Sequence, residues 1–78
     1  MPQGRVELRR FKAADDQGRA ITVIEIKPTS FERGINGELI DLSPRYTIFE
    51  LPDGEPVNRR KDGTYEVVNT RQILREIG

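Results

Sequence analysis

The chain lacks both cysteine and histidine. Without cysteine it can form neither a disulfide nor a thiolate metal site. Without histidine it has lost the commonest general base and metal ligand. No apolar run approaches the ~20 residues that cross a membrane, and the first ten residues lack the apolar core of a signal peptide. We therefore expect a cytoplasmic protein with no metal, no cofactor and no membrane contact.

The residues that are present offer little for catalysis. Nucleophilic catalysis requires a base beside a serine, threonine or cysteine, and Ser30 and Ser43 have no histidine to activate them. Asp15-Asp16 lacks the alternating ligands of a calcium loop. No phosphate-binding or dinucleotide-binding fingerprint occurs. We expect that the chain is not an enzyme.

Length and charge set two further limits. A chain of 78 residues makes one domain, which we expect to span residues 1–78. Thirteen basic residues balance thirteen acidic ones, so the net charge is zero. No overall field therefore attracts nucleic acid.

Two Asp-Gly turns organise the C-terminal half of the chain. Asp53-Gly54 and Asp62-Gly63 each suit a three-residue hairpin loop that ends in a bulge. These loop lengths, followed by a four-residue loop over 69–72, align one apolar row across four strands. The predicted row is Phe49, Val57, Val67 and Leu74. Residues 45–77 therefore read as an antiparallel meander.

The N-terminal residues 5–27 read as a second hairpin. Its second run, residues 20–27, is rich in β-branched residues. If Val6 lies opposite Ile26, the apolar side changes faces along the hairpin, which favours a strongly twisted ribbon. A β-bulge near Arg9-Arg10 or Val23-Ile24 is the alternative. Pro28 is expected to end the second strand, because proline cannot donate to a ladder.

Two segments leave alternatives open. In residues 28–44, Asn36-Gly37 suits a two-residue hairpin that would place Phe31 opposite Leu42. The same segment also reads as an irregular loop packed over the sheet. Residues 70–77 read as a short helix or as a strand, and the strand is favoured because eight residues are few for a helix. The predicted fold is an all-β antiparallel meander of five or six strands, curved into a roll or barrel-like sheet.

A family resemblance lies in the same C-terminal half. The matching residues are Tyr46, Asp53-Gly54, Val57-Asn58, Asp62-Gly63-Thr64-Tyr65, Glu66-Val67-Val68 and Thr70. The segment resembles small bacterial proteins of uncharacterised function, in which a DGxxVN turn precedes a DGT-aromatic-EVV strand. The resemblance implies a small bacterial β domain and assigns no activity and no site residues.

The second face of the predicted meander suggests a function. About half of this face is apolar, whereas a solvated sheet face is mostly polar. Its residues are Tyr46, Ile48, Glu50, Asn58, Arg60, Glu66, Val68 and Ile73, and the candidates for binding are Tyr46, Ile48, Arg60 and Val68. Either another part of the chain covers this face or another molecule does. The second alternative predicts a non-catalytic interaction module that binds a protein partner, or forms a homodimer, through these four residues.

A nucleic-acid-binding module is the rival prediction. Small β-barrels bind single strands through basic and aromatic side chains. The candidate residues are Arg9, Arg10, Lys12, Arg59, Arg60 and Lys61. We favour protein binding, because three of the five aromatic residues, Phe11, Phe31 and Phe49, read as core.

Overall fold

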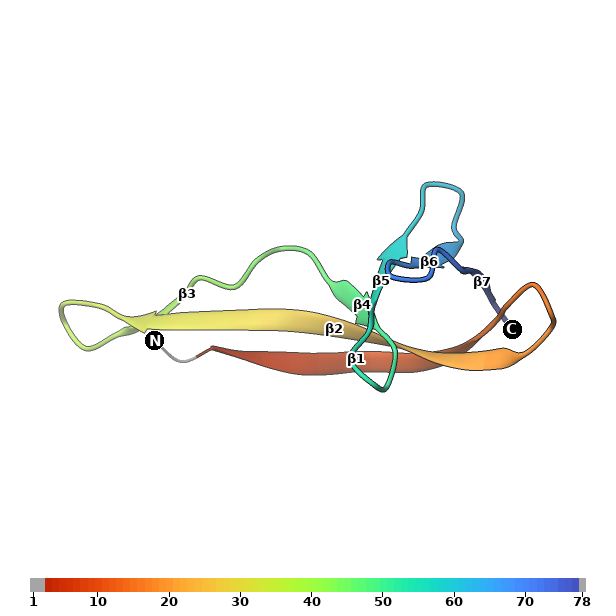
Figure 1. Cartoon of the computed structure of the whole chain (residues 1–78). Coiled ribbons are helices and arrows are strands. Elements are labelled where there is room, and N and C mark those ends of the chain that lie inside the picture. The colour runs from red at the N-terminus through yellow and green to blue at the C-terminus, as the bar shows by residue number, and fades with distance from the viewer. Residues whose placement is uncertain (1–2, 78) are drawn as a thin grey trace.

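The computed structural model describes residues 3–77, and all the elements in this range are β-strands. The strands, labelled in Figure 1, are β1 (Gln3–Ala14), β2 (Ala20–Arg33), β3 (Leu39–Asp41), β4 (Ile48–Glu50), β5 (Pro56–Arg59), β6 (Tyr65–Val67) and β7 (Ile73–Glu76). They pair antiparallel in one curved sheet. This confirms the predicted all-β class, with seven strands in the described range where five or six were expected. Residues 1–2 and 78 of the predicted domain lie outside the described residues.

The sheet closes on itself at one end of the molecule. Its strand order is β1-β7-β6-β5-β4-β2-β3, and β1 also pairs with β2, so six strands form a ring of hydrogen bonds. The ring is not a regular barrel, because β1 and β2 continue far beyond it (Figure 1). The molecule is accordingly elongated, with extents of 56 × 23 × 20 Å. We call residues 9–26 and 48–77 the ring, and residues 3–8 and 27–47 the arm.

The interior of the ring holds the hydrophobic core. The centroid of the aromatic side chain of Tyr65 lies 5.2 Å from that of Phe11 and 5.1 Å from that of Phe49. The predicted row is confirmed where Phe49 pairs with Val57 and Val57 with Val67. The buried core residues are Ala13, Val23, Phe49, Val57, Tyr65, Val67 and Leu74.

The last strand confirms one prediction and corrects another. Residues 73–76 form β7, as the strand alternative for this segment predicts. Leu74, however, lies opposite Tyr65 and not opposite Val67. The connecting loop begins one residue earlier than expected, because the N–H of Val67 donates to the carbonyl of Gln72 at 2.9 Å. Arg71 closes that loop in the left-handed conformation, with φ of 62°.

The Asp-Gly loops have the predicted three-residue form. In the first, the N–H of Leu51 donates to the carbonyl of Glu55 at 2.9 Å, and Gly54 has φ of 91°. In the second, Arg60 donates to Thr64 at 2.7 Å. The positive φ explains the glycine, because other L-residues are strained there. These loops therefore set the register of β4, β5 and β6.

The register of the N-terminal hairpin differs from the prediction. Val6 lies opposite Lys27, and Phe11 lies opposite Val23. A β-bulge between Glu7 and Arg9 shifts the pairing by one residue, as the alternative interpretation allowed. The bulge lets Phe11 and Val23 share the inner face of the ring although the apolar pattern changes phase before them.

Pro28 does not end β2, which runs on to Arg33. The backbone N–H and carbonyl of Ser30, two residues later, face away from β1 toward the segment that holds Leu42 and Ser43. Because backbone direction alternates along a strand, the nitrogen of Pro28 faces the same way. It lies between the residues of β2 that pair with β4 and those that pair with β3, so no ladder bond is lost.

The segment after Pro28 forms a hairpin followed by a loop. The N–H of Gly34 donates to the carbonyl of Glu38 at 2.7 Å, which is the three-residue loop of the Asp-Gly turns and not the predicted two-residue turn. Phe31 consequently lies opposite Asp41 and not opposite Leu42. β3 thus extends the sheet at the far end of the arm.

Candidate functional site

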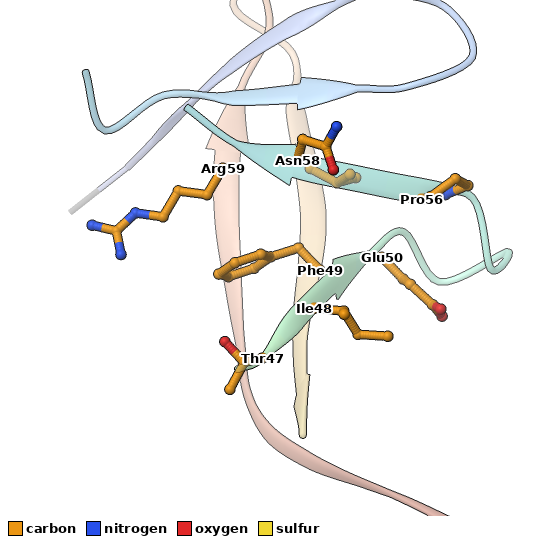
Figure 2. Close-up of a pocket in the computed structure, with 8 residues that line it drawn as sticks. Thr47, Ile48, Phe49, Glu50, Pro56, Asn58 and Arg59 are labelled. Carbon is orange, nitrogen blue, oxygen red and sulfur yellow. The ribbon is translucent and has the colours of Figure 1, made fainter. Parts of the chain in front are cut away.

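A cavity of about 350 Å³ lies where β4 and β5 separate. The two strands pair only at Phe49–Val57 and Glu50–Pro56. Figure 2 shows Phe49 and Arg59 on one side of the sheet and Ile48 and Glu50 on the other. The lining residues are Thr47, Ile48, Phe49, Glu50, Pro56, Val57, Asn58 and Arg59.

The polar groups of this cavity are largely used within the chain. A carboxylate oxygen of Glu50 lies 2.6 Å from Nη2 of Arg5. The hydroxyl of Thr47 donates to Glu25 at 2.8 Å. Asn58 and Arg59 remain as exposed polar groups at the surface. The cavity can therefore accept an apolar or hydrogen-bonding side chain, but its groups form no acid–base pair.

Arg9 links three strands of the ring. Its Nε donates to Glu25 Oε1 at 2.8 Å, and its Nη1 donates to Glu76 Oε2 at 3.2 Å. Its guanidinium lies 4.3 Å from the centroid of the Phe11 ring. The hydrogen bond from Arg9, and then the one from Thr47, hold the pKa of Glu25 below its ordinary value. Arg9 thus ties β1 to β2 and β7.

The other residues of the nucleic-acid prediction divide into two groups. Arg10 donates to Glu7 at 2.8 Å, and Lys12 donates to Thr22 at 2.6 Å. Arg59, Arg60 and Lys61 lie exposed at the end of β5 and in the turn that follows it. With Arg9 counted, three of the six cations already donate to acceptors in this chain. A phosphate would have to compete with those acceptors.

The predicted protein-binding residues lie in different parts of the molecule. Tyr46 is exposed just before β4, and Ile48 is half-buried within it. The N–H of Val68 donates to the carbonyl of Pro56, which places Val68 beside the start of β5. Arg60 lies in the turn after the opposite end of that strand. Ile48 belongs to the cavity, whereas Tyr46 belongs to the arm.

The arm exposes an apolar surface that the sequence interpretation missed. Among the described residues, nine large hydrophobic residues are exposed, and seven of them lie in the arm. These seven are Val6, Leu8, Ile35, Leu39, Ile40, Leu42 and Tyr46. We call them the arm surface. The twisted-ribbon interpretation of the N-terminal hairpin and the loop-packing alternative for residues 28–44 would both have covered such side chains. No residue pattern signals this surface, because Pro28 indicates the end of a strand although β2 continues through it to Arg33.

The arm also carries an unpaired backbone edge. The backbone of Ser30 faces away from β1, and Ser30 lies opposite Gln3. When two residues lie opposite each other in an antiparallel pair, the backbone N–H and carbonyl groups of both face the partner strand or those of both face away from it. Every second residue from Gln3, namely Arg5 and Glu7, therefore directs its N–H and carbonyl away from β2. In the described part of the chain, β7 reaches β1 only at Lys12 and beyond, so these groups have no strand partner.

Residues 3–77 show no group of three or more acidic side chains placed to hold a metal ion. Nor do they contain a helix long and apolar enough to cross a membrane. Comparison of the chain with protein-family models, with curated proteins and with solved structures gives no significant match. The function must therefore be argued from the surface itself.

Proposed function

We propose that the chain is a non-catalytic interaction module that binds a protein partner or a second copy of itself through the arm. The observation that supports this function is the contrast in burial. All buried residues of the described range lie in the ring, while most exposed large hydrophobic residues lie in the arm. A concentration of exposed large hydrophobic residues in one part of a soluble protein is typical of an interaction site.

The construction of the arm supports the same function. Between the ring and β3, the arm is a ribbon of β1 and β2. Two-stranded ribbons are marginally stable in water, and exposed edges readily accept another strand. A partner that covers the arm would supply the packing that the chain itself does not. Tyr46 remains part of this surface, whereas Ile48, Arg60 and Val68 lie on the ring.

The test compares arm and ring substitutions in one binding assay. Leu39→Ser and Leu42→Ser remove apolar side chains of the arm surface, and the matched control, Val68→Ser, removes one from the ring. Sedimentation velocity over a concentration series and pull-down from extract are measured for each. We expect the arm variants to lose self-association or partner capture and the control to keep it. Equal behaviour of all three variants and the unmodified chain would contradict the proposal.

The same material tests the nucleic-acid alternative. Binding through phosphates weakens steeply with salt. Fluorescence anisotropy with single-stranded and double-stranded DNA and RNA at ~50 mM salt is sufficient to detect it. Salt-sensitive binding that is lost on Arg60→Ala and Lys61→Ala would favour this alternative over the arm. We expect no such binding, because Arg9, Arg10 and Lys12 already have acceptors.

A further inference from the structure

The outer edge of β1 has a pattern of charge that is complementary to itself. Arg5 and Glu7 direct their backbone groups outward, and Val6 between them is bonded toward β2. Suppose a second copy lies antiparallel with its Val6 opposite Val6. Arg5 of each copy then faces Glu7 of the other, and opposite charges on facing strands stabilise the pair.

We infer that the free edge of β1 pairs with the same edge of a second copy about a two-fold axis at Val6. This inference rests on the proposed function and names the partner. Arg5 and Glu7 of the two copies would exchange four backbone hydrogen bonds, two at each facing pair. The three-stranded sheet of each arm would become half of one continuous sheet.

Neighbouring registers are less favourable. An axis at Arg5 places two arginines opposite each other, and an axis at Glu7 places two glutamates opposite each other. Like charges directly opposite destabilise a strand pair. The Val6 register also brings the two Val6 side chains together at a non-hydrogen-bonded pair, where side chains approach most closely. That contact covers a residue that is now half exposed.

The existing ion pairs are compatible with this register. Arg5 binds Glu50 through Nη2, and Arg10 binds Glu7 through Nε. A guanidinium has five N–H donors and a carboxylate accepts several bonds, so both can add a partner. The side chains of Arg5 and Glu7 are about half exposed.

The bulge limits the length of this pairing, and the two-fold symmetry limits the assembly to a dimer. It lies between Glu7 and Arg9 and interrupts the regular edge. The ladder is therefore confined to the residues before it. A two-fold contact uses the same edge in both copies and closes the assembly. The ladder is short, so we expect a weak, concentration-dependent dimer, at the small end of protein interfaces.

Disulfide trapping tests the register directly, because the natural chain contains no cysteine. Cα atoms of a non-hydrogen-bonded pair lie about 4.5 Å apart, within the range of a disulfide. We expect oxidised Val6→Cys to form covalent dimer to a several-fold greater extent than Val68→Cys, an exposed control on the ring. In denaturant, both cysteine variants should form the same low level of covalent dimer. Equal trapping of the two variants in the folded state would overturn the inference.

Charge reversal provides a second, independent test. Arg5→Glu and Glu7→Arg alone should each reduce the dimer seen by sedimentation, because like charges then face each other. The double variant should restore it. Within one chain, the same double variant loses the bonds to both Glu50 and Arg10, so its melting temperature should be the lowest. Restored association despite a lower melting temperature supports the inference, and association that merely follows stability contradicts it.

The two proposals fail in different ways. If Val6→Cys is not trapped but Leu39→Ser still removes binding, the β1 edge is wrong and the arm remains the binding surface. If Val6→Cys is trapped while Leu39→Ser leaves association unchanged, the β1 edge is the binding surface and the apolar side chains of β3 are not. If Val6→Cys is not trapped and Leu39→Ser changes neither association nor capture, both proposals fall.

Discussion

The ring and the arm share the same two long strands, yet only the ring buries its side chains. In the ring, β1 pairs with β7 and β2 pairs with β4, so the sheet closes on itself, and Val23 is wholly buried. In the arm, within residues 3–77, the same strands pair only with β3 and with each other, and Val6 is half exposed. Closure of the sheet, and not strand formation, is what gives this chain a core.

The comparison also separates two kinds of charged residue. Arg9 and Glu25 in the ring belong to a network that reaches Glu76 and Thr47. Arg5 of the arm reaches across β2 to bind Glu50 of the ring. These charged side chains therefore connect neighbouring strands. In the arm, the backbone edge beside Arg5 and Glu7 stays open to a partner.

The largest expected effect is on folding stability and comes from the core. Leu74→Ala should lower the free energy of unfolding by ~2–5 kcal/mol, because Leu74 is fully buried in the ring. Leu39→Ala in the arm should change it by less than about 0.5 kcal/mol in dilute solution. Urea denaturation followed by circular dichroism measures both. Comparable losses would mean that the arm packs as tightly as the ring.

A smaller effect is expected at the turn between β1 and β2. Asp15 accepts bonds from the N–H groups of Gln17 and Arg19, and its Oδ2 accepts one from Gln72 Nε2 at 3.1 Å. Asp15→Ala should lower the melting temperature, because it releases this turn from the loop before β7. Asp16→Ala alters an exposed neighbour and is the matched control. A control that melts as early as Asp15→Ala would argue against the connection to Gln72.

Acid should weaken the ring gradually. Hydrogen bonds from Arg19, Arg9 and Thr64 hold the pKa values of Asp15, Glu25 and Asp62 below their ordinary values. The folded chain thus binds fewer protons in acid than the unfolded chain. This stabilisation is present above the ordinary carboxyl pKa of ~4 and is lost as the pH falls through the lowered values. Melting temperatures measured from neutral pH downward should show the loss, and it should be smaller in Glu25→Gln. An unchanged acid profile in that variant would remove Glu25 from the account.

Turn chemistry was the most predictable feature of the sequence. The Asp-Gly loops specified the pairing of Phe49 with Val57 and of Val57 with Val67, because loop length sets register. The register of β1 against β2 could not be derived in the same way. The bulge after Glu7 has no residue signature, and it places Phe11 opposite Val23, at a core assembled from distant strands.

The arm could not be predicted from the sequence for a related reason. A proline in a β-rich run normally marks the end of a strand, and Pro28 is tolerated because its nitrogen faces a gap between β4 and β3. Whether such a gap exists depends on where β4 pairs, which is a property of the whole sheet. Of the residues predicted to bind a protein, Ile48, Arg60 and Val68 lie in β4, after the end of β5 and beside its start, whereas the exposed hydrophobic residues gather in the arm.

Amide hydrogen exchange of Arg5 and Glu7 at several protein concentrations tests the central claim most directly. Their N–H groups point outward from β1, whereas those of Leu51 and Val67 are bonded within the ring. We predict that exchange at Arg5 and Glu7 slows as concentration rises, while exchange at Leu51 and Val67 stays constant. Exchange at Arg5 and Glu7 that does not depend on concentration would contradict the account of the arm as a self-pairing surface.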